Sequence, residues 1–297
     1  MSWYKASGKD SDMVISTRVR LARNISGFNF PSRLGASDAE KIIDLVWESL
    51  APVAKDYTLY RIDKLSPVKQ QALIEKHLIS PDLTGGRLPR AAIINRDESV
   101  SIMVNEEDHI RIQSLTPGLS PRDAWDAANK IDDLIGETID FAFHERFGYL
   151  TSCPTNTGTG LRISAMLHLP VLALTGGISG LFSQAAKTGM TIRGLFGEGS
   201  EAKGNFYQFS NQTTLGMTEE ELISTFEKVV AAVSDTEKSL RKGLKKEAPP
   251  KIVDRIMRSY GTMKYSYMMP GSELINKLSD VRLGIYLGII EDIPFEK

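Results

Sequence analysis

The chain has 297 residues and a single cysteine, Cys153, so it cannot form an internal disulfide and fits a reducing compartment. Neither charge is in excess: 36 Lys and Arg stand against 37 Asp and Glu, and the net charge is −1. This balance gives no electrostatic case for nucleic acid or an anionic membrane as partner. The N-terminus has no apolar segment of the signal-peptide kind, and no run approaches the roughly 20 apolar residues of a membrane span. We therefore expect a cytoplasmic globular protein.

The sequence also lacks the familiar nucleotide-binding signatures. It contains neither the GxxxxGK[ST] loop nor a GxGxxG that opens a helix after a strand. The protein-kinase set of a Gly-rich loop, HRD and DFG is missing as well. If the chain binds a nucleotide, it must do so by other residues.

Local patterns predict an α+β fold, a large and mostly antiparallel sheet flanked by helices, followed by a small helical region. A capping box, Ser37-Asp38-Ala39-Glu40, is expected to open one helix, and 82–89 is expected to be a loop. Segment 161–169 fits a strand or a helix by periodicity alone. The Pro249-Pro250 pair marks a boundary between a catalytic region at 14–245 and a C-terminal region at 251–297. The other expected strands are 13–19, 57–62, 91–95, 100–104, 110–115, 149–152, 190–194 and 205–209, and the other expected helices are 66–77, 120–135, 176–189 in part, 218–245, 252–260 and 270–288.

Three consecutive acids, Glu106, Glu107 and Asp108, follow the apolar run 100–104. Like charges this close repel and raise each other's pKa unless a cation lies among them. A guanidinium fits carboxylates best, because its planar fork pairs with two oxygens at once. The segment is therefore predicted to hold an arginine side chain.

Several arginines lie beside Gly, Ser or Thr, an arrangement that suits a polyphosphate. Their forks reach phosphate oxygens, and small neighbours let the backbone approach. The alternative for any single arginine is a surface salt bridge, and that alternative loses weight only if several arginines converge. The arginines in question are Arg18, Arg20, Arg111, Arg162 and Arg193.

Four segments resemble the motifs of the ATP:guanidino phosphotransferases, the family of arginine kinase and creatine kinase. They are STRVRLARN (16–24), NEEDHIRIQ (105–113), CPTNTGTGLR (153–162) and RGLFGE (193–198), in family order. A fifth segment, LIEKHLISP (73–81), is similar to one in the bacterial protein-arginine kinases. The resemblance extends to about residue 245, and it implies a guanidino kinase catalytic domain.

The resemblance implies two catalytic carboxylates, Glu107 and Glu198, which would orient a guanidinium and accept its proton. Taken alone, Glu107 could instead be a solvated turn acid. Cys153 matches the family's reactive cysteine, near the substrate guanidinium; its alternative is a buried, inert thiol. If Cys153 has the family role, its oxidation is expected to inhibit the enzyme.

The resemblance also implies an ATP site in which the five arginines neutralise the phosphates and Mg²⁺ bridges them, without an all-protein metal cage. His77 would contact the base or ribose, or else it caps its own helix. His109 is not expected to be the base. The full set of nucleotide-contacting residues implied by the motifs is Ser16, Thr17, Arg18, Val19, Arg20, His77, Arg111, Arg162, Ile163, Ser164, Ala165, Met166, Arg193, Gly194, Leu195, Phe196, Gly197 and Glu198.

The implied activity is Mg-ATP-dependent phosphorylation of protein arginine in the stress response, with a zinc-binding activator protein and a Clp-type protease as partners. Two alternative functions remain: a kinase of free arginine or another small guanidino compound, and a catalytically inactive, nucleotide-binding adaptor. The chain lacks the N-terminal helical domain of the small-substrate enzymes, which favours an open site. The C-terminal region resembles a dimerisation region but ends before the family's RDxxRA phosphoarginine motif, and Gly199 stands where a histidine or serine often follows the glutamate.

Overall fold

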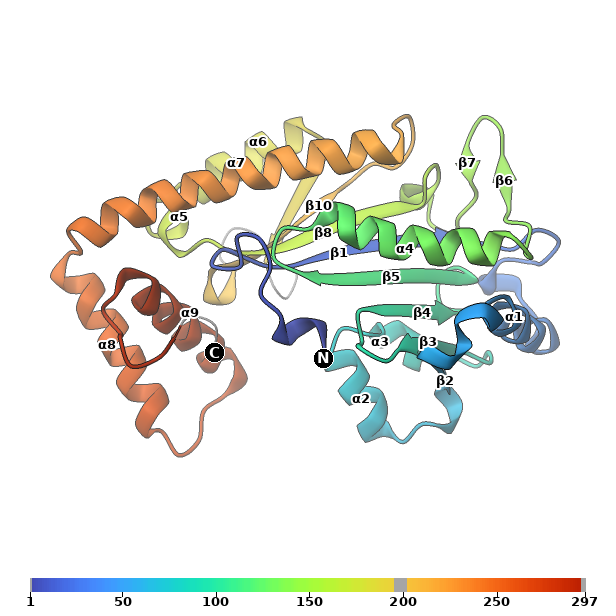
Figure 1. Cartoon of the computed structure of the whole chain (residues 1–297), viewed down its shortest axis with the longest axis horizontal. Coiled ribbons are helices and arrows are strands. Elements are labelled where there is room, and N and C mark those ends of the chain that lie inside the picture. Colours follow the sequence, from blue (N-terminus) through green and yellow to red (C-terminus); the bar gives the residue numbers. More distant parts are fainter. Residues whose placement is uncertain (1, 195–201, 295–297) are drawn as a thin grey trace.

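The computed structural model describes residues 2–194 and 202–294 and contains one large sheet with helices packed on it (Figure 1). The sheet has eight strands in the order β2-β3-β4-β5-β1-β8-β10-β9, and all neighbouring pairs are antiparallel. A separate hairpin is formed by β6 (Phe143–His144) and β7 (Gly148–Tyr149). The α+β prediction is confirmed. The sheet strands are β1 (Val14–Arg23), β2 (Tyr57–Arg61), β3 (Ala91–Asn95), β4 (Val100–Val104), β5 (Ile110–Pro117), β8 (Leu161–His168), β9 (Met190–Gly194) and β10 (Phe206–Asn211).

The longest helix, α7, runs along the sheet beside α4, while α8 and α9 pack against each other at one end of the molecule (Figure 1). Among the described residues, no helix is both long and apolar enough to cross a membrane. The helices are α1 (Ala36–Ser49), α2 (Pro67–Glu75), α3 (Pro81–Thr84), α4 (Pro121–Gly136), α5 (Pro170–Leu174), α6 (Ile178–Lys187), α7 (Glu219–Lys246), α8 (Pro250–Tyr265) and α9 (Gly271–Leu287).

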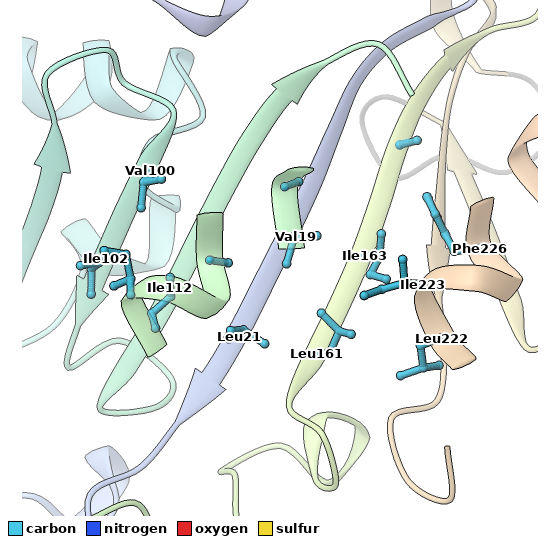
Figure 2. Close-up of a cluster of buried hydrophobic side chains, with 14 of the residues drawn as sticks. Val19, Leu21, Val100, Ile102, Ile112, Leu161, Ile163, Leu222, Ile223 and Phe226 are labelled. Carbon is cyan, nitrogen blue, oxygen red and sulfur yellow. The ribbon is translucent and has the colours of Figure 1, made fainter. Parts of the chain in front are cut away.

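The main core lies between one face of the sheet and the helices (Figure 2). Val19 and Leu21 of β1 and Ile163 of β8 point into it, together with Phe226 of α7. Because side chains alternate across a strand, the residues between these positions must emerge on the opposite face. Over β3 and β4 that opposite face packs against α2 and α3 in a second apolar cluster, and over β1 and β8 it is available for a site.

Three local predictions are wrong. The helix α1 begins at Ala36 after the N-cap Gly35, so Ser37 lies inside the helix and makes no capping bond. The short helix α3 occupies the start of the expected 82–89 loop, because Ser80 caps the backbone N–H of Leu83. In 149–152 only Tyr149 is in a strand, since the chain turns away after the hairpin. The helix α5 was not expected.

Segment 161–169 is a strand, which settles the alternative left open by periodicity. β8 pairs with β1 on one side and β10 on the other, so it is an interior strand. The helices α8 and α9 share a smaller apolar cluster that includes Ile256, Val281 and Leu287, together with Val171 of α5.

Candidate active site

Five arginines emerge on the sheet face opposite the core. Arg20 of β1 pairs directly with Arg162 of β8, and Ala22 pairs with Arg111 of β5. Arg18 lies two residues before Arg20 and therefore on the same face. Arg193 of β9 belongs to this face as well, because it pairs with Gln208, which pairs in turn with Met166 of β8. Several arginines therefore converge on one face, and this convergence weighs against the surface salt-bridge alternative.

The arginines are close enough to disturb one another's ionisation. Burial lowers the pKa of Arg18 to about 10, with further lowering by Arg162 and Arg111. Burial and Arg162 likewise lower the pKa of Arg111 to about 10, although Asp82 opposes this shift. The pKa of Arg20 falls well below its ordinary value, first by burial and then by the three neighbouring guanidinium groups. A polyanion bound among them would relieve this repulsion.

Arg162 adds an independent indication of an anion-binding site. Its Nε atom is buried, and it has no hydrogen-bond acceptor among the residues that the structure describes. A buried donor without an acceptor costs free energy, so a ligand oxygen at this position would be stabilising. The arginine face therefore fits a phosphate-bearing ligand.

The three acids lie in the tight turn between β4 and β5, and each has a different environment. Asn105 opens the turn with a φ of +61°, and its side chain donates to the carbonyl oxygens of Ala39 and Pro89. Glu106 is buried, forms an ion pair with Arg111 and accepts a hydrogen bond from Ser80. The predicted arginine between the acids is therefore Arg111.

Glu107 is the one acid of the three that faces the open site, with 48% of its side chain exposed. Its Oε2 atom lies 4.0 Å from Nη2 of Arg111. Burial of its inner part raises the pKa of Glu107, and the charge of Asp108 raises it further, while Arg20 and Arg162 lower it. A carboxylate with a raised pKa is a better proton acceptor.

Asp108 connects the acid turn to the cysteine segment. It is 2% exposed, and its Oδ1 accepts from Nδ2 of Asn24 at 2.6 Å and from the backbone N–H of Ser152 at 2.7 Å. Ser152 immediately precedes Cys153, which is half-buried, with its Sγ 3.0 Å from Oγ1 of Thr155. Partial exposure argues against the inert-core alternative for Cys153. Burial and then Arg193 lower the pKa of Arg162, while Cys153 and Glu107 oppose this shift, so both groups lie within electrostatic reach of Arg162.

Two adjoining hollows share Arg20 and Arg111. The first, of about 350 Å³, is lined by Arg20, Ala22, Glu107, Arg111, Asn156, Gly160 and Arg162. The second, of about 710 Å³, is lined by Arg18, Arg20, Ile74, His77, Ile79, Ser80, Pro81, Met103, Arg111 and Gln113. The first hollow contains the carboxylate and the second contains the imidazole, so an elongated ligand could occupy both.

Three polar lining residues were missed by the sequence reasoning, although all lie inside the segments quoted for the resemblance. Asn156 belongs to CPTN, Ser80 to LIEKHLISP and Gln113 to NEEDHIRIQ. Gln113 could have been found by alternation, because it is two residues from Arg111 on β5. Its Nε2 donates to the carbonyl of His77 at 2.6 Å and so holds α2 against the site.

His77 closes its own helix, and its position is also compatible with the expected contact to a nucleotide. Its backbone closes α2 with a φ of +58°, with bonds from His77 N–H to Ile74 and from Leu78 N–H to Leu73, as in a Schellman cap. Its ring meanwhile lines the second hollow, where burial and Arg18 lower its pKa. His109, in contrast, is fully buried: Nδ1 accepts from the N–H of Ile25, and Nε2 bonds to the carbonyl of Asn29. His109 therefore has a structural role.

Some residues expected to contact the nucleotide do not reach this face. The side chains of Val19, Ile163 and Ala165 lie in the core, because they alternate with the arginine and serine positions. Thr17 is buried and bonded to Gly118 and Ser120. These four expectations are corrected. Ser16, Ser164 and Met166 share the arginine face, and Ser164 accepts from Nε of Arg18 at 3.4 Å.

The expected site continues beyond the end of β9. Gly194 ends β9 and pairs with Tyr207 of β10. Leu195, Phe196, Gly197 and Glu198 lie outside the described residues. Their expected roles rest on the resemblance alone.

Comparisons with known proteins agree with this geometry. Residues 38–240 match the ATP:guanido phosphotransferase C-terminal catalytic domain, and residues 249–297 match the protein-arginine kinase McsB C-terminal domain. A protein-arginine kinase of Desulforamulus reducens is 47% identical over 297 residues, which cover 98% of this chain and 83% of the relative. One of Caldanaerobacter subterraneus subsp. tengcongensis is 47% identical over 285 residues, 95% of this chain and 85% of the relative. The crystal structure of lombricine kinase superposes with a TM-score of 0.71 at 25% identity, covering 78% of this chain and 68% of that one. The chain belongs to the ATP:guanido phosphotransferase family and, within it, to the McsB-type protein-arginine kinases.

Proposed function

We propose that this chain transfers the γ-phosphoryl group of ATP to a guanidino nitrogen of arginine side chains in proteins, in a Mg²⁺-dependent reaction. The observation that carries the proposal is the convergence of Glu107 and the arginines on one cleft beside Cys153. The relatives that are named protein-arginine kinases support a protein arginine as the acceptor.

The arginine face would hold the phosphates. Arg18, Arg20, Arg111 and Arg162 offer planar forks to the phosphate oxygens, and the ion pair with Glu106 fixes Arg111 in place beforehand. Within the described residues no group of three or more His, Cys, Asp or Glu side chains could hold a metal ion. When bound together with the nucleotide, Mg²⁺ would neutralise part of the phosphate charge beside the arginine face.

Glu107 would act on the acceptor. The guanidino nitrogen attacks the γ-phosphorus, the bond from that phosphorus to the bridging oxygen breaks, and ADP leaves with the electron pair. The proton lost by the nitrogen passes to the Glu107 carboxylate. Because the free guanidinium has a pKa above about 12, orienting it in line contributes as much as removing its proton. Glu198 would supply the second carboxylate, and Cys153 would border the guanidinium.

The experiment that tests this proposal offers purified protein and Mg-ATP either an unfolded arginine-containing protein or free arginine. Phosphoarginine is read by phosphorus NMR and by mass spectrometry. Product on the protein substrate and none on free arginine is the expected result. Product on free arginine alone would move the activity to a small-molecule guanidino kinase, and ATP binding without any product would favour the adaptor.

A further inference from the structure

The β6–β7 hairpin ends in an exposed aromatic tip. All five residues 143–147 are exposed, and Phe143 and Phe147 expose 58% and 41% of their surface. Each phenylalanine ring packs against an aromatic ring of the same hairpin. The ring centroids of Phe143 and Tyr149 lie 5.2 Å apart in an edge-on arrangement, and those of Phe147 and His144 lie 4.9 Å apart. The tip therefore presents ordered apolar surface to solvent.

The base of the hairpin is firmly attached to the active-site segments. Tyr149 and Gly158 exchange backbone hydrogen bonds of 2.8 and 3.2 Å, and Ala142 N–H donates to Asn24 at 2.7 Å. The Tyr149 ring also lies 3.5 Å from the guanidinium of the buried Arg23. An isolated two-stranded hairpin is marginally stable, so these anchors determine where the arm points.

The hairpin stands at the same end of the sheet as the proposed acceptor site (Figure 1). The end of β1, the start of β8 and the turn that carries Glu107 meet there, because Arg23 pairs with Ile110 and Leu21 with Leu161. β7 continues directly through Leu150 to Cys153. At about 3.3 Å per residue, the six residues from Phe147 to Cys153 span at most about 20 Å.

Single exposed apolar side chains are ordinary on protein surfaces. The tip differs because two phenylalanines are concentrated on an anchored arm that leads into the site. Its charged residues, Glu145 and Arg146, balance each other, so the arm favours apolar partners over charged ones.

We propose that the β6–β7 hairpin is a docking arm for client polypeptides, on which Phe143 and Phe147 bind an apolar side chain that lies within about six residues of the target arginine. The inference rests on the proposed function and names its substrate class: an extended or unfolded segment with an apolar residue near the arginine. Folded clients bury such residues, so the arm favours unfolded ones.

The test compares two peptides with one arginine each, one carrying a leucine within six residues of it and the other a serine at that position. The variant is F143S/F147S, the conservative rescue is F143L/F147L, and the control is Tyr4→Ser, an aromatic residue 47% exposed on a different part of the surface. For F143S/F147S we expect KM for the leucine peptide to rise roughly tenfold, the equivalent of one buried apolar side chain, with kcat unchanged. KM for the serine peptide should not move.

F143L/F147L should restore most of the preference, and Tyr4→Ser should behave as wild type. An unchanged KM for the leucine peptide, or an equal rise for both peptides, would overturn the docking arm while leaving the kinase proposal intact. If wild-type protein phosphorylates neither peptide, the proposed function itself fails. Thermal unfolding of F143S/F147S checks that the variant is folded.

Discussion

Three adjacent acids have three different environments, and this is decided by burial rather than by residue type. Glu106 is buried on Arg111, Asp108 is buried on Asn24 and Ser152, and Glu107 faces the cleft. The sequence predicted that an arginine is held here. It could not say which acid holds the arginine, because the direction of each acid depends on the turn, and this turn starts from a positive φ at Asn105.

A substitution at Asp108 tests what sets the pKa of Glu107. In Asp108→Asn the amide oxygen can still accept from Asn24 and Ser152, but the negative charge is gone. That charge raises the pKa of Glu107, as burial and Asp82 do, whereas Arg20 and Arg162 lower it. The variant should therefore lower the pKa of Glu107. Since the ionised form accepts the proton, the acidic limb of the profile of kcat/KM against pH should move to lower pH.

The matched control for this prediction is Asn24→Ala, which removes one hydrogen-bond donor to Asp108 and keeps the Asp108 charge. It should reduce kcat without the shift to lower pH. An acidic limb that stays in place in Asp108→Asn, or that moves to higher pH, would be incompatible with Glu107 as the proton acceptor.

Alternation explains both the success and the errors of the sequence reasoning at the site. A strand at 13–19 that continues to residue 20 carries Arg18 and Arg20 on one face, as the structure has them. Ile163 and Ala165 were wrongly kept in the site because the resemblance implied every residue of 162–166, and a motif does not distinguish the two faces of a strand. Once β8 is known to be a strand, both residues belong to the core.

At the scale of the element, two similar sequences at expected helix starts behaved differently. Thr218 forms a complete capping box with Glu221, in which each side chain bonds the backbone of the other residue. Ser37 was expected to do the same, but the N-cap of α1 is Gly35, two residues earlier, and the helix begins at Ala36. The pattern is short, so packing of the apolar face of α1 decides where the helix begins.

The capping box of α7 leads to a stability prediction. Thr218→Ala removes the acceptor of the Glu221 backbone N–H and should lower the free energy of unfolding by about 1 kcal/mol. The measurement is the urea midpoint at constant m-value. Thr236→Ala serves as control, because that hydroxyl only bonds the carbonyl of Ala232 within the same helix. A loss no larger than that of the control would show that packing alone fixes the start of α7.

At the scale of the whole molecule, a buried polar junction joins the sheet to the C-terminal helices. Arg241 of α7 is fully buried, pairs with Glu237 at 2.8 Å and donates to the carbonyl of His168 at the end of β8. His168 lies 2.8 Å from the hydroxyl of Ser279 on α9, and burial with Arg241 and Arg282 holds its pKa well below the ordinary value. The strand that carries Arg162 is thereby tied to α9.

Breaking this junction should be costly. In Glu237→Gln the charge of Arg241 loses its partner, and an amide N–H replaces an oxygen that accepts from Val171 or Leu172. We expect a loss of about 3–5 kcal/mol in the free energy of unfolding, measured by urea titration. Glu220→Gln, which breaks the exposed pair with Arg122, should change it far less. Equal effects of the two variants would show that the junction contributes no more than a surface pair.

The sequence predicted the fold class, seven of the eight sheet strands and the long helices, because these follow from local periodicity and caps. It could not predict the strand order, the junction at Arg241 or the hairpin tip. Those features depend on residues far apart in the chain, such as Arg241 and His168, and local patterns carry no information on such pairs.

The central claim is that Glu107 acts on the acceptor while the arginine face holds the phosphates. The most direct test measures kcat for protein arginine phosphorylation and the Kd for Mg-ATP in Glu107→Gln. The account predicts that kcat falls by roughly 10²–10⁴, as for loss of a general base, while the Kd stays near that of wild type. A kcat close to wild type, or a Kd weakened as much as kcat falls, would contradict it.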